Sequence, residues 1–469
     1  MGFAWFRKKK EMPKLSPEAQ EEKWKKRDVE TLKAGKLASL ALELTDSLIK
    51  KHGPRLAGSA ACRETADDLA GQYKPFCTRV SSDSFRFHAK AYQMPLRLAG
   101  YCYIASLVLL YVGLPLSALL LLSLFLWYAW RESISYRPIL EDFSKKEEGK
   151  NVTAVLEPSG EVHGTLIFSG HHDSAPLPRY SRMEKIPYLL HVLLPDALFV
   201  LLCTESVVQL LTEIFTGRLF AAGLPSVGLL IYLVLLTAGI PLVWGMRKNY
   251  LDEASPGAGD NLVSSAMTVE LARYFDWKKK CGEPLSHTRL VFVSFDGEEA
   301  GLRGSRKWFA SHKDLTKGAH MLNFDCPYYA DQLKFLDKDI NGKQPLSAKL
   351  SQEMVRIAKG MGYQAETMSI PFLSGGTDAA EGTRAGVESC TLTAVAWGNP
   401  KYPSVYHSRE DVVDAIEKET LERSLSVAIR LTELVDGGKL YEDDKPIMEE
   451  TKPDEGTADL PSLHFTRPV

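Results

Sequence analysis

The sequence lacks the excess of basic residues that marks a nucleic-acid-binding protein. Its 469 residues include 57 Lys and Arg against 59 Asp and Glu, which gives a formal net charge of -2 at pH 7. This balance argues against a nucleic-acid partner. The first residues, MGFAWFRKKK, also lack the apolar core and the cleavage site of a signal peptide.

Cysteine is scarce and scattered. The seven cysteines form no CxxC pair and show none of the short spacings of disulfide-rich secreted domains. An odd, dispersed set of this kind is typical of reduced thiols. It therefore indicates a domain that faces the cytosol.

Charge is missing altogether from two long stretches. Residues Leu98–Trp130 carry no charged side chain, although about 20 apolar residues are enough to cross a membrane. The VGLPLS segment in the middle indicates a turn, which gives two short crossings or a re-entrant hairpin. In the second region, Ile186–Met246, the part Leu219–Trp244 is also uncharged, whereas Ile186–Leu211 carries two carboxylates and is the weaker span.

Basic residues flank both apolar regions, whereas the turns on the far side carry only Arg218. The positive-inside rule then places all flanking sequence in the cytoplasm. Because these flanks belong to one folded domain, each insertion crosses the bilayer an even number of times. We therefore expect an integral, multi-pass membrane protein with two hairpins, four crossings and a cytoplasmic catalytic domain.

Acidic and histidine residues follow several short apolar runs. The runs TLIFSG, VFVSF and HMLNF are each followed by such residues, and a Gly-rich loop carries another before a predicted helix. A single Asp in such a place is usually a helix N-cap, and a single His is usually hydrogen-bonded. Two adjacent glutamates, Glu298 and Glu299, repel each other unless solvent or a cation separates their charges. Together the residues favour zinc, with cobalt or manganese as alternatives.

Six motifs occur in a fixed order along the chain. They are GPRLAGS from Gly53, HHD from His171, GDN from Gly259, DGEEAGLRGS from Asp296, NFD from Asn323 and YH from Tyr406. This order resembles that of the co-catalytic two-zinc aminopeptidases, the family of bacterial leucyl aminopeptidase, aminopeptidase S and glutamate carboxypeptidase. The resemblance covers about residues 30–435, apart from the apolar insertions. The CPYY segment after Asp325 departs from the family pattern and leaves the substrate preference open.

The resemblance implies a three-layer α/β/α sandwich around a mixed, mostly parallel sheet, interrupted by transmembrane helical hairpins. The zinc-peptidase domain would then be discontinuous. The predicted segments are a polar N-terminal stretch at 1–29, the peptidase domain at 30–97, 131–185 and 247–435, hairpins at 98–130 and 186–246, and a disordered acidic tail at 436–469.

The resemblance also implies two zinc ions per chain and a ligand for each position. His171 and Asp325 would bind one ion, and Glu299 and His407 would bind the other. Asp260 would bridge the two ions. The ions would activate a water molecule for attack on a peptide bond.

Three further residues would act around the metal ions. Glu298 would be the general base that takes the proton of the water, and Tyr406 would help to stabilise the oxyanion. Asp173 would accept a hydrogen bond from the ring of His171 and so orient it. We expect an extended segment at Glu298 and Glu299, in which neighbouring side chains diverge toward the water and the metal.

The predicted function is therefore that of a membrane-anchored zinc aminopeptidase that removes N-terminal residues from peptides. One alternative is another amide hydrolase, or an acyl-transfer enzyme like the glutaminyl cyclases, on the same site. Another is a non-catalytic receptor or scaffold, which loss of metal ligands would mark. The oligomeric state, the native metal and the preferred substrate side chain stay open.

Overall fold

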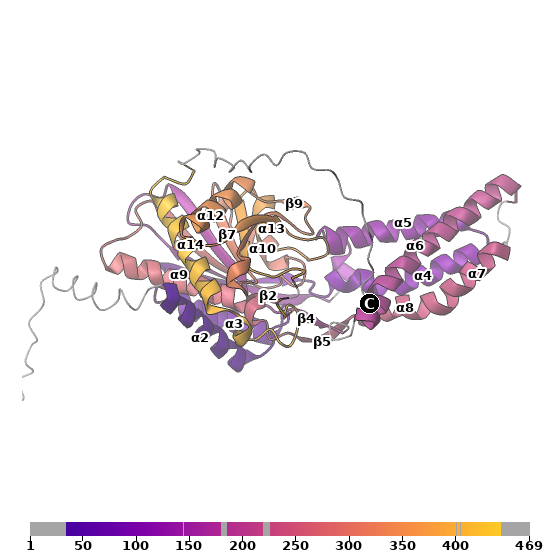
Figure 1. Cartoon of the computed structure of the whole chain (residues 1–469), viewed down its shortest axis with the longest axis horizontal. Coiled ribbons are helices and arrows are strands. Elements are labelled where there is room, and N and C mark those ends of the chain that lie inside the picture. Colours follow the sequence, from indigo (N-terminus) through magenta and orange to yellow (C-terminus); the bar gives the residue numbers. More distant parts are fainter. Residues whose placement is uncertain are drawn as a thin grey trace, which may run out of the picture.

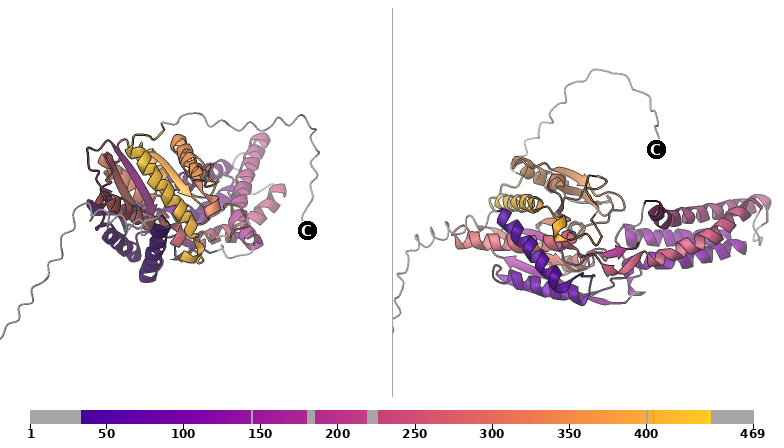
Figure 2. Two further views of the ribbon diagram at one scale, coloured as in Figure 1. Left: turned by 60° about the vertical axis from the view of Figure 1, so that its left-hand side comes forward. Right: turned by 60° about the horizontal axis from the view of Figure 1, so that its bottom comes forward.

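The computed structural model describes residues 34–441, except 144, 180–184, 219–225, 400 and 404. The predicted N-terminal stretch 1–29 and most of the predicted acidic tail lie outside the described residues. Figure 1 shows two parts, a sheet covered by helices and a bundle of long helices that projects from one side of it. The right-hand view of Figure 2 shows the same projection from another direction.

A nine-stranded mixed sheet forms the centre of the larger part. Its strand order is β1-β2-β6-β3-β7-β11-β8-β10, with β9 paired to β8. The strands are β1 (Arg79–Phe87), β2 (Glu147–Leu156), β3 (Gly164–His171), β6 (Thr288–Phe295), β7 (His320–Asp325), β8 (Lys334–Asp339), β9 (Gln344–Pro345), β10 (Glu366–Ser369) and β11 (Glu388–Thr393). The central strands β6, β3, β7 and β11 are parallel. They read as continuous apolar runs because both of their faces are buried.

Helices cover both faces of this sheet. Phe168 belongs to one hydrophobic core, whereas its neighbour Ile167 belongs to the core on the opposite face. The first core is closed by α2 (Ala34–His52), α3 (Ala60–Tyr73), α9 (Val263–Lys280), α12 (Ala348–Gly360) and α14 (Lys418–Asp436). The second is closed by α10 (Arg303–Ser311), α11 (Lys313–Thr316) and α13 (Ala379–Arg384). The predicted three-layer α/β/α fold is confirmed.

The parallel strands bring their carboxyl ends to one edge of the sheet. There β3 ends at His171, β7 ends at Asp325, and β6 ends one residue before Asp296. Side chains that follow parallel strands meet at such an edge, where α/β sheets form their sites.

The first apolar insertion folds as a helical hairpin between β1 and β2. Helix α4 (Met94–Tyr111) and helix α5 (Pro115–Ala129) pack together and are joined by a short turn at 112–114. Gly113 has a φ of 79°, which glycine adopts without the strain that a side chain would add. Pro115 starts α5, where its missing N–H costs nothing.

The second insertion lies between β4 (Pro176–Pro178) and β5 (Tyr250–Ala254), which pair antiparallel. It consists of α6 (Lys185–Thr216), α7 (Ser226–Val234), the π-helical turn η4 (Leu235–Gly239) and α8 (Ile240–Gly245). The start of the predicted span Leu219–Trp244 lies outside the described residues.

The inserted helices form a bundle with apolar outer faces and a largely apolar interior, in which Glu205, Gln209 and Glu213 are also buried. Tyr103 and Phe125 pack their rings on Phe199 at centroid distances of 5.3 and 5.4 Å. On the outer faces, side chains such as Leu120 and Leu230 are 62% and 70% exposed. Three stretches, Ala91–Tyr111, Leu193–Thr216 and Leu229–Lys248, are long and apolar enough to cross a membrane. An outer surface of this kind suits a lipid environment better than water.

A buried ion pair joins the first hairpin to the part that contains the sheet. Glu132 lies in the π-helical turn η2 (Trp130–Ile134) after α5 and accepts a hydrogen bond of 2.6 Å from Arg303, at the start of α10. Arg384 also donates to the carbonyl of Ser135 at 2.9 Å. These contacts fix the base of the hairpin against the domain.

Candidate metal centre and active site

Asp260 lies between two histidines. Its Oδ1 is 3.4 Å from Nε2 of His171, and its Oδ2 is 3.1 Å from Nε2 of His407. Two ligand atoms that each lie about 2.0 Å from one tetrahedral zinc ion are separated by about 3.3 Å. Asp260 therefore has the placement that the predicted bridging role requires, with one oxygen toward each histidine.

The other predicted side chains surround this centre. Glu298 Oε2 is 3.8 Å from Nε2 of His171, and Glu299 Oε2 is 3.5 Å from Nε2 of His407. A ring nitrogen of His171 and one carboxylate oxygen from each of Glu298 and Asp325 all lie within 4.8 Å of one another. The structure thus brings together all five predicted ligands and the predicted base.

The GPRLAGS motif owes its position to a buried arginine. Arg55 donates hydrogen bonds to the carbonyls of Gly53 (3.0 Å), His172 (2.8 Å), Pro256 (2.9 Å) and Gly257 (2.8 Å). Burial lowers the pKa of Arg55 to about 10. The guanidinium therefore ties the end of β3, which carries one histidine, to the loop that carries the central aspartate.

Asp173 connects β3 to the two glutamates. Its Oδ1 and Oδ2 accept hydrogen bonds from the backbone N–H groups of Glu298 (3.3 Å) and Glu299 (3.0 Å). Its Oδ1 also lies 3.3 Å from Nδ1 of His171, and its backbone oxygen lies 3.2 Å from the same nitrogen. Asp173 thus contacts the histidine as predicted and, in addition, fixes the loop of the glutamates.

The expectation of an extended segment at the two glutamates is wrong. Gly301 and Leu302 both donate their N–H groups to the carbonyl of Glu298 at 2.8 Å, so the chain turns here. The turn leads into α10, which starts at Arg303, four residues after Glu299. Their side chains separate because the backbone turns, and not because strand side chains alternate.

Asp411 is a buried positioning residue that the sequence motifs do not reveal. Its carboxylate accepts the N–H groups of Gly259 (2.8 Å) and Asp260 (3.2 Å). Burial raises its pKa to about 7. The only sequence signal is an acidic residue four positions after His407, which is also typical of a solvent-exposed turn.

The buried carboxylates of the centre favour positive charge beside them. Burial raises the pKa of Glu298 and of Asp325 well above the usual carboxyl values. Burial alone would lower the pKa of the histidines, but the neighbouring carboxylates raise that of His171 well above 6.5 and that of His407 to about 10. Burial alone would likewise raise the pKa of Asp260, whereas hydrogen bonds from both histidines lower it.

The donor set also fits zinc. It consists of imidazole nitrogens and carboxylate oxygens, which are the usual zinc ligands. The buried Oε1 of Glu299 accepts no hydrogen bond from the residues that the structure describes. Cys326, which follows Asp325 in the unusual CPYY segment, brings its thiol within 4.8 Å of the ligand oxygens of Asp260 and Asp325.

A cavity of about 180 Å³ opens over the glutamates. Tyr406 lines it and stacks on the ring of His407 at a centroid distance of 3.8 Å. Burial raises the pKa of Tyr406 well above 10, so its hydroxyl is a hydrogen-bond donor at neutral pH. Tyr92 and Tyr136, from the two flanks of the first hairpin, also line it. The segments that flank the insertion therefore contribute to this cavity.

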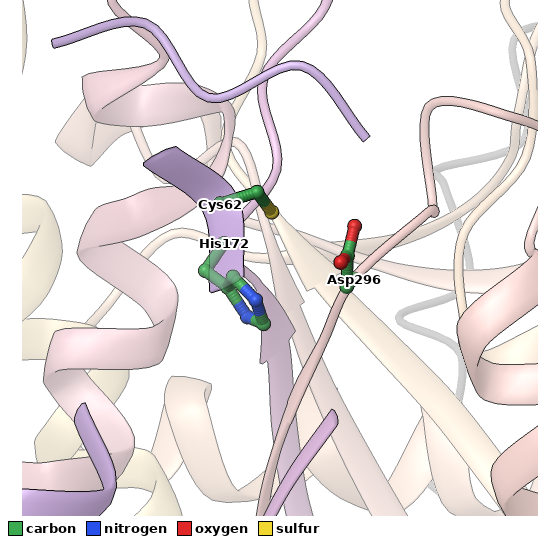
Figure 3. Close-up of side chains that lie close together, drawn as sticks. All are labelled: Cys62, His172 and Asp296. Atoms are coloured by element: carbon green, nitrogen blue, oxygen red, sulfur yellow. The ribbon is translucent and has the colours of Figure 1, made fainter. Parts of the chain in front are cut away.

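A second polar cluster lies beside the centre and is fully buried. Figure 3 shows Cys62, His172 and Asp296, with the thiol of Cys62 directed toward the carboxylate of Asp296. Asp296 accepts the N–H groups of Gly58 and Lys150, each at 3.0 Å. These bonds attach the GPRLAGS loop and β2 to the end of β6, which gives the cluster a structural role.

Comparison with known proteins identifies the family of one part of the chain. Residues 244–432 match the model of peptidase family M28. The match confirms the family expected from the motifs and, with it, a peptide-bond hydrolase as the class of enzyme. A comparison with curated protein sequences finds no match.

Several solved structures are similar in fold at low sequence identity. A zinc aminopeptidase from Bacillus subtilis has 15% identity and a TM-score of 0.48, and the match covers 86% of this chain and 94% of that chain. A Zn-dependent exopeptidase from Parabacteroides distasonis has 14% identity and a TM-score of 0.49, with coverage of 84% and 97%. A glutaminyl cyclase from Bacteroides thetaiotaomicron, bound to N-acetylhistamine, has 13% identity and a TM-score of 0.49, with coverage of 84% and 97%.

Proposed function

Because the chain carries a peptidase family M28 domain that includes residues 244–432, we propose that it is a membrane-anchored, zinc-dependent aminopeptidase. The observation that supports this most directly is the placement of Asp260 between His171 and His407, with a carboxylate beside each histidine. Such a set can hold two cations a short distance apart.

One zinc ion would be held by His171 and Asp325, and a second by Glu299 and His407, with Asp260 shared between them. Bound in this way, the ions would polarise the scissile carbonyl and make a water molecule more acidic.

Glu298 is the residue that moves protons in this proposal. Its carboxylate faces the centre, 3.8 Å from Nε2 of His171, and contributes no ligand to the proposed sets. Burial raises its pKa, which makes the carboxylate a stronger base toward a proton. Glu298 takes a proton from the attacking water and delivers it to the leaving amine. The hydroxyl of Tyr406 donates a hydrogen bond to the substrate oxygen as negative charge develops there.

The surroundings of the centre favour a free amino terminus. The cavity above Glu298 and Glu299 is small, about 180 Å³, and is closed on one side by Tyr92 and Tyr136. A cavity of this size holds one residue rather than a continuing chain. The carboxylates on its floor would attract the α-amine of a peptide, which gives an aminopeptidase rather than an endopeptidase.

The two helical hairpins would anchor the enzyme to the cytoplasmic face of a membrane. The proposal rests on the three apolar helical stretches and on the exposed apolar surface of the bundle. An epitope placed in the C-terminal tail should resist protease added outside sealed right-side-out vesicles. It should become cleavable once detergent opens them, and digestion before that point would contradict a cytoplasmic domain.

The catalytic proposal is tested with Glu298→Gln and the matched control Glu283→Gln, an exposed residue that pairs with Lys278. After reconstitution with zinc, all three proteins should hold about two ions per chain, measured by elemental analysis. Turnover of aminoacyl chromogenic substrates should fall about 10²–10⁴-fold in Glu298→Gln alone.

Two results would contradict this proposal. Less than one zinc ion per chain in the wild type, under metal-replete conditions, would show that the ligand assignment is wrong. Full metal content without turnover of any peptide would favour another amide substrate or a non-catalytic role.

A further inference from the structure

A second, larger cavity adjoins the one at the metal centre. It has a volume of about 550 Å³. The residues that line both cavities are Tyr92, Gln93, Pro176, Tyr250 and Glu299. A molecule held at Glu299 can therefore extend from the small cavity into the large one.

The larger cavity is basic. Five cationic side chains line it: Lys90, Arg97, Arg179, Arg247 and Lys248. Two carboxylates also reach it, but Glu299 belongs to the metal centre and Glu253 forms an ion pair with Arg409. Within the described part of the chain, no carboxylate lies at ion-pair distance from Arg97, Arg179 or Lys248. Arg97, Arg179 and Lys248 thus bring to the cavity positive charge that the described carboxylates leave unpaired.

The basic residues come from the flanks of both insertions. Arg97 lies in the second turn of α4, Arg179 follows β4, and Arg247 and Lys248 lie in the 3-10 turn η5 (Met246–Lys248) after α8. Arg247 lies over the rings of Tyr101 and Trp244, at 5.3 and 4.5 Å, which holds its guanidinium in place.

The positive-inside rule explains why basic residues occur at the ends of these helices. It does not explain why they surround a cavity that reaches Glu299, because lipid-facing charges need only lie on the outer rim of the bundle.

We propose that this basic cavity binds a carboxylate of the peptide substrate, so that the enzyme prefers peptides that place a carboxylate a short distance from their N-terminus. The inference rests on the proposed peptidase function and specifies its substrate class. Arginine binds carboxylates in a two-pronged geometry, and a lysine adds a point charge. The carboxylate is supplied by an acidic side chain or by the free C-terminus of a short peptide, either of which can enter the cavity while the α-amine stays at the metal centre.

Two peptide pairs separate these sources of charge. The first compares amidated Leu-Gly-Asp with amidated Leu-Gly-Asn, and the second compares Leu-Gly-Gly with its amide. In neutral detergent, kcat/KM should be about tenfold higher for the charged member of at least one pair. The ratio should decrease as salt is added.

Variants then assign the preference to the cavity. Arg97→Gln, and the double variant that adds Arg247→Gln, should reduce the ratio within each pair toward one. Arg430→Gln is the matched control, because Arg430 lies on α14 and pairs with Glu433 outside the cavity. The control should keep the preference of the wild type. A preference that survives in the double variant would overturn the inference.

Binding to zinc-loaded Glu298→Ala tests the cavity separately from hydrolysis, with fluorescently labelled versions of the same peptides. Tighter binding of the charged peptides without turnover in the wild type would support the cavity and reject the peptidase. Turnover with equal binding and equal kcat/KM in both pairs would retain the peptidase and overturn the inference. If the pairs are equal and the double variant instead loses binding to phosphatidylglycerol vesicles, the cavity is a lipid headgroup site, which also overturns it.

Discussion

Replacing Asp173 by Asn should weaken zinc binding although Asp173 is not itself a proposed ligand. The carboxylate accepts two backbone N–H groups, at 3.0 and 3.3 Å, and faces Nδ1 of His171 at 3.3 Å. An asparagine has one acceptor oxygen, so one N–H of the glutamate turn loses its partner. An NH₂ group in the place of Oδ1 cannot accept a hydrogen bond from Nδ1 of His171. Only the backbone oxygen of residue 173, at 3.2 Å, then favours the tautomer that leaves Nε2 free for a metal ion.

The expected size of the effect follows from these contacts. A buried N–H without a partner costs about 1–3 kcal/mol. Loss of a residue that orients a ligand histidine typically lowers metal affinity about 10–100-fold, which corresponds to about 1.4–2.8 kcal/mol. We therefore expect the zinc dissociation constant of Asp173→Asn to rise by about one to two orders of magnitude.

Competition with a chromogenic chelator at fixed pH measures this constant without any assay of activity. Asp314→Asn, at an exposed position of α11, is the matched control and should bind zinc like the wild type. An unchanged dissociation constant in Asp173→Asn, with intact folding, would refute the idea that this carboxylate orients His171 and the turn.

Three further predictions concern stability, each read from thermal unfolding in detergent. Arg55→Lys keeps the charge, but a lysine cannot donate hydrogen bonds to all four carbonyls that Arg55 contacts. The free energy of unfolding should therefore fall by at least about 2 kcal/mol, and an unchanged Tm would contradict this. Arg303→Met should lower the free energy of unfolding by about 3–5 kcal/mol, because it removes the cationic partner of the buried Glu132. Adding Glu132→Met should restore most of this free energy. Hydrogen bonding from His320 lowers the pKa of Glu388 from 4.5 to about 2. The ionised carboxylate of Glu388 therefore stabilises the fold above pH 4.5, and this stabilisation is lost as the pH falls toward 2. Glu388→Gln should therefore be less stable than the wild type at pH 6, and a Tm gap that does not narrow below pH 4 would refute the assignment.

The part of the site that the sequence reveals is the part that follows strands. His171 and Asp325 end apolar runs that become central parallel strands, so their meeting at one edge follows from the topology. The bridging position of Asp260 comes from the family resemblance, and the structure gives it a compatible geometry. The ligand roles themselves remain predictions until metal binding is measured.

The supporting residues could not be predicted, because their partners are backbone groups far away in sequence. Asp411 binds the N–H groups of Gly259 and Asp260, about 150 positions earlier, and no local pattern marks such a contact. In the sequence, Tyr92 and Tyr136 lie in the flanks of an apolar insertion, where nothing marks them as residues of the site. They reach the site because the insertion docks against α10 through the ion pair of Glu132 and Arg303.

The points of insertion explain how two apolar helical insertions can interrupt the candidate metal centre in sequence without separating its residues in space. The first hairpin connects β1 to β2, and the second connects β4 to β5; both strand pairs are antiparallel neighbours. The chain therefore leaves the domain and returns to it at adjacent points, as a helical hairpin requires. The second hairpin separates His171 from Asp260 in sequence, yet the two side chains end 3.4 Å apart. Residues at the base of both hairpins, such as Tyr92, Arg97 and Arg247, line the cavities next to Glu299, so the insertions shape the surroundings of the candidate site.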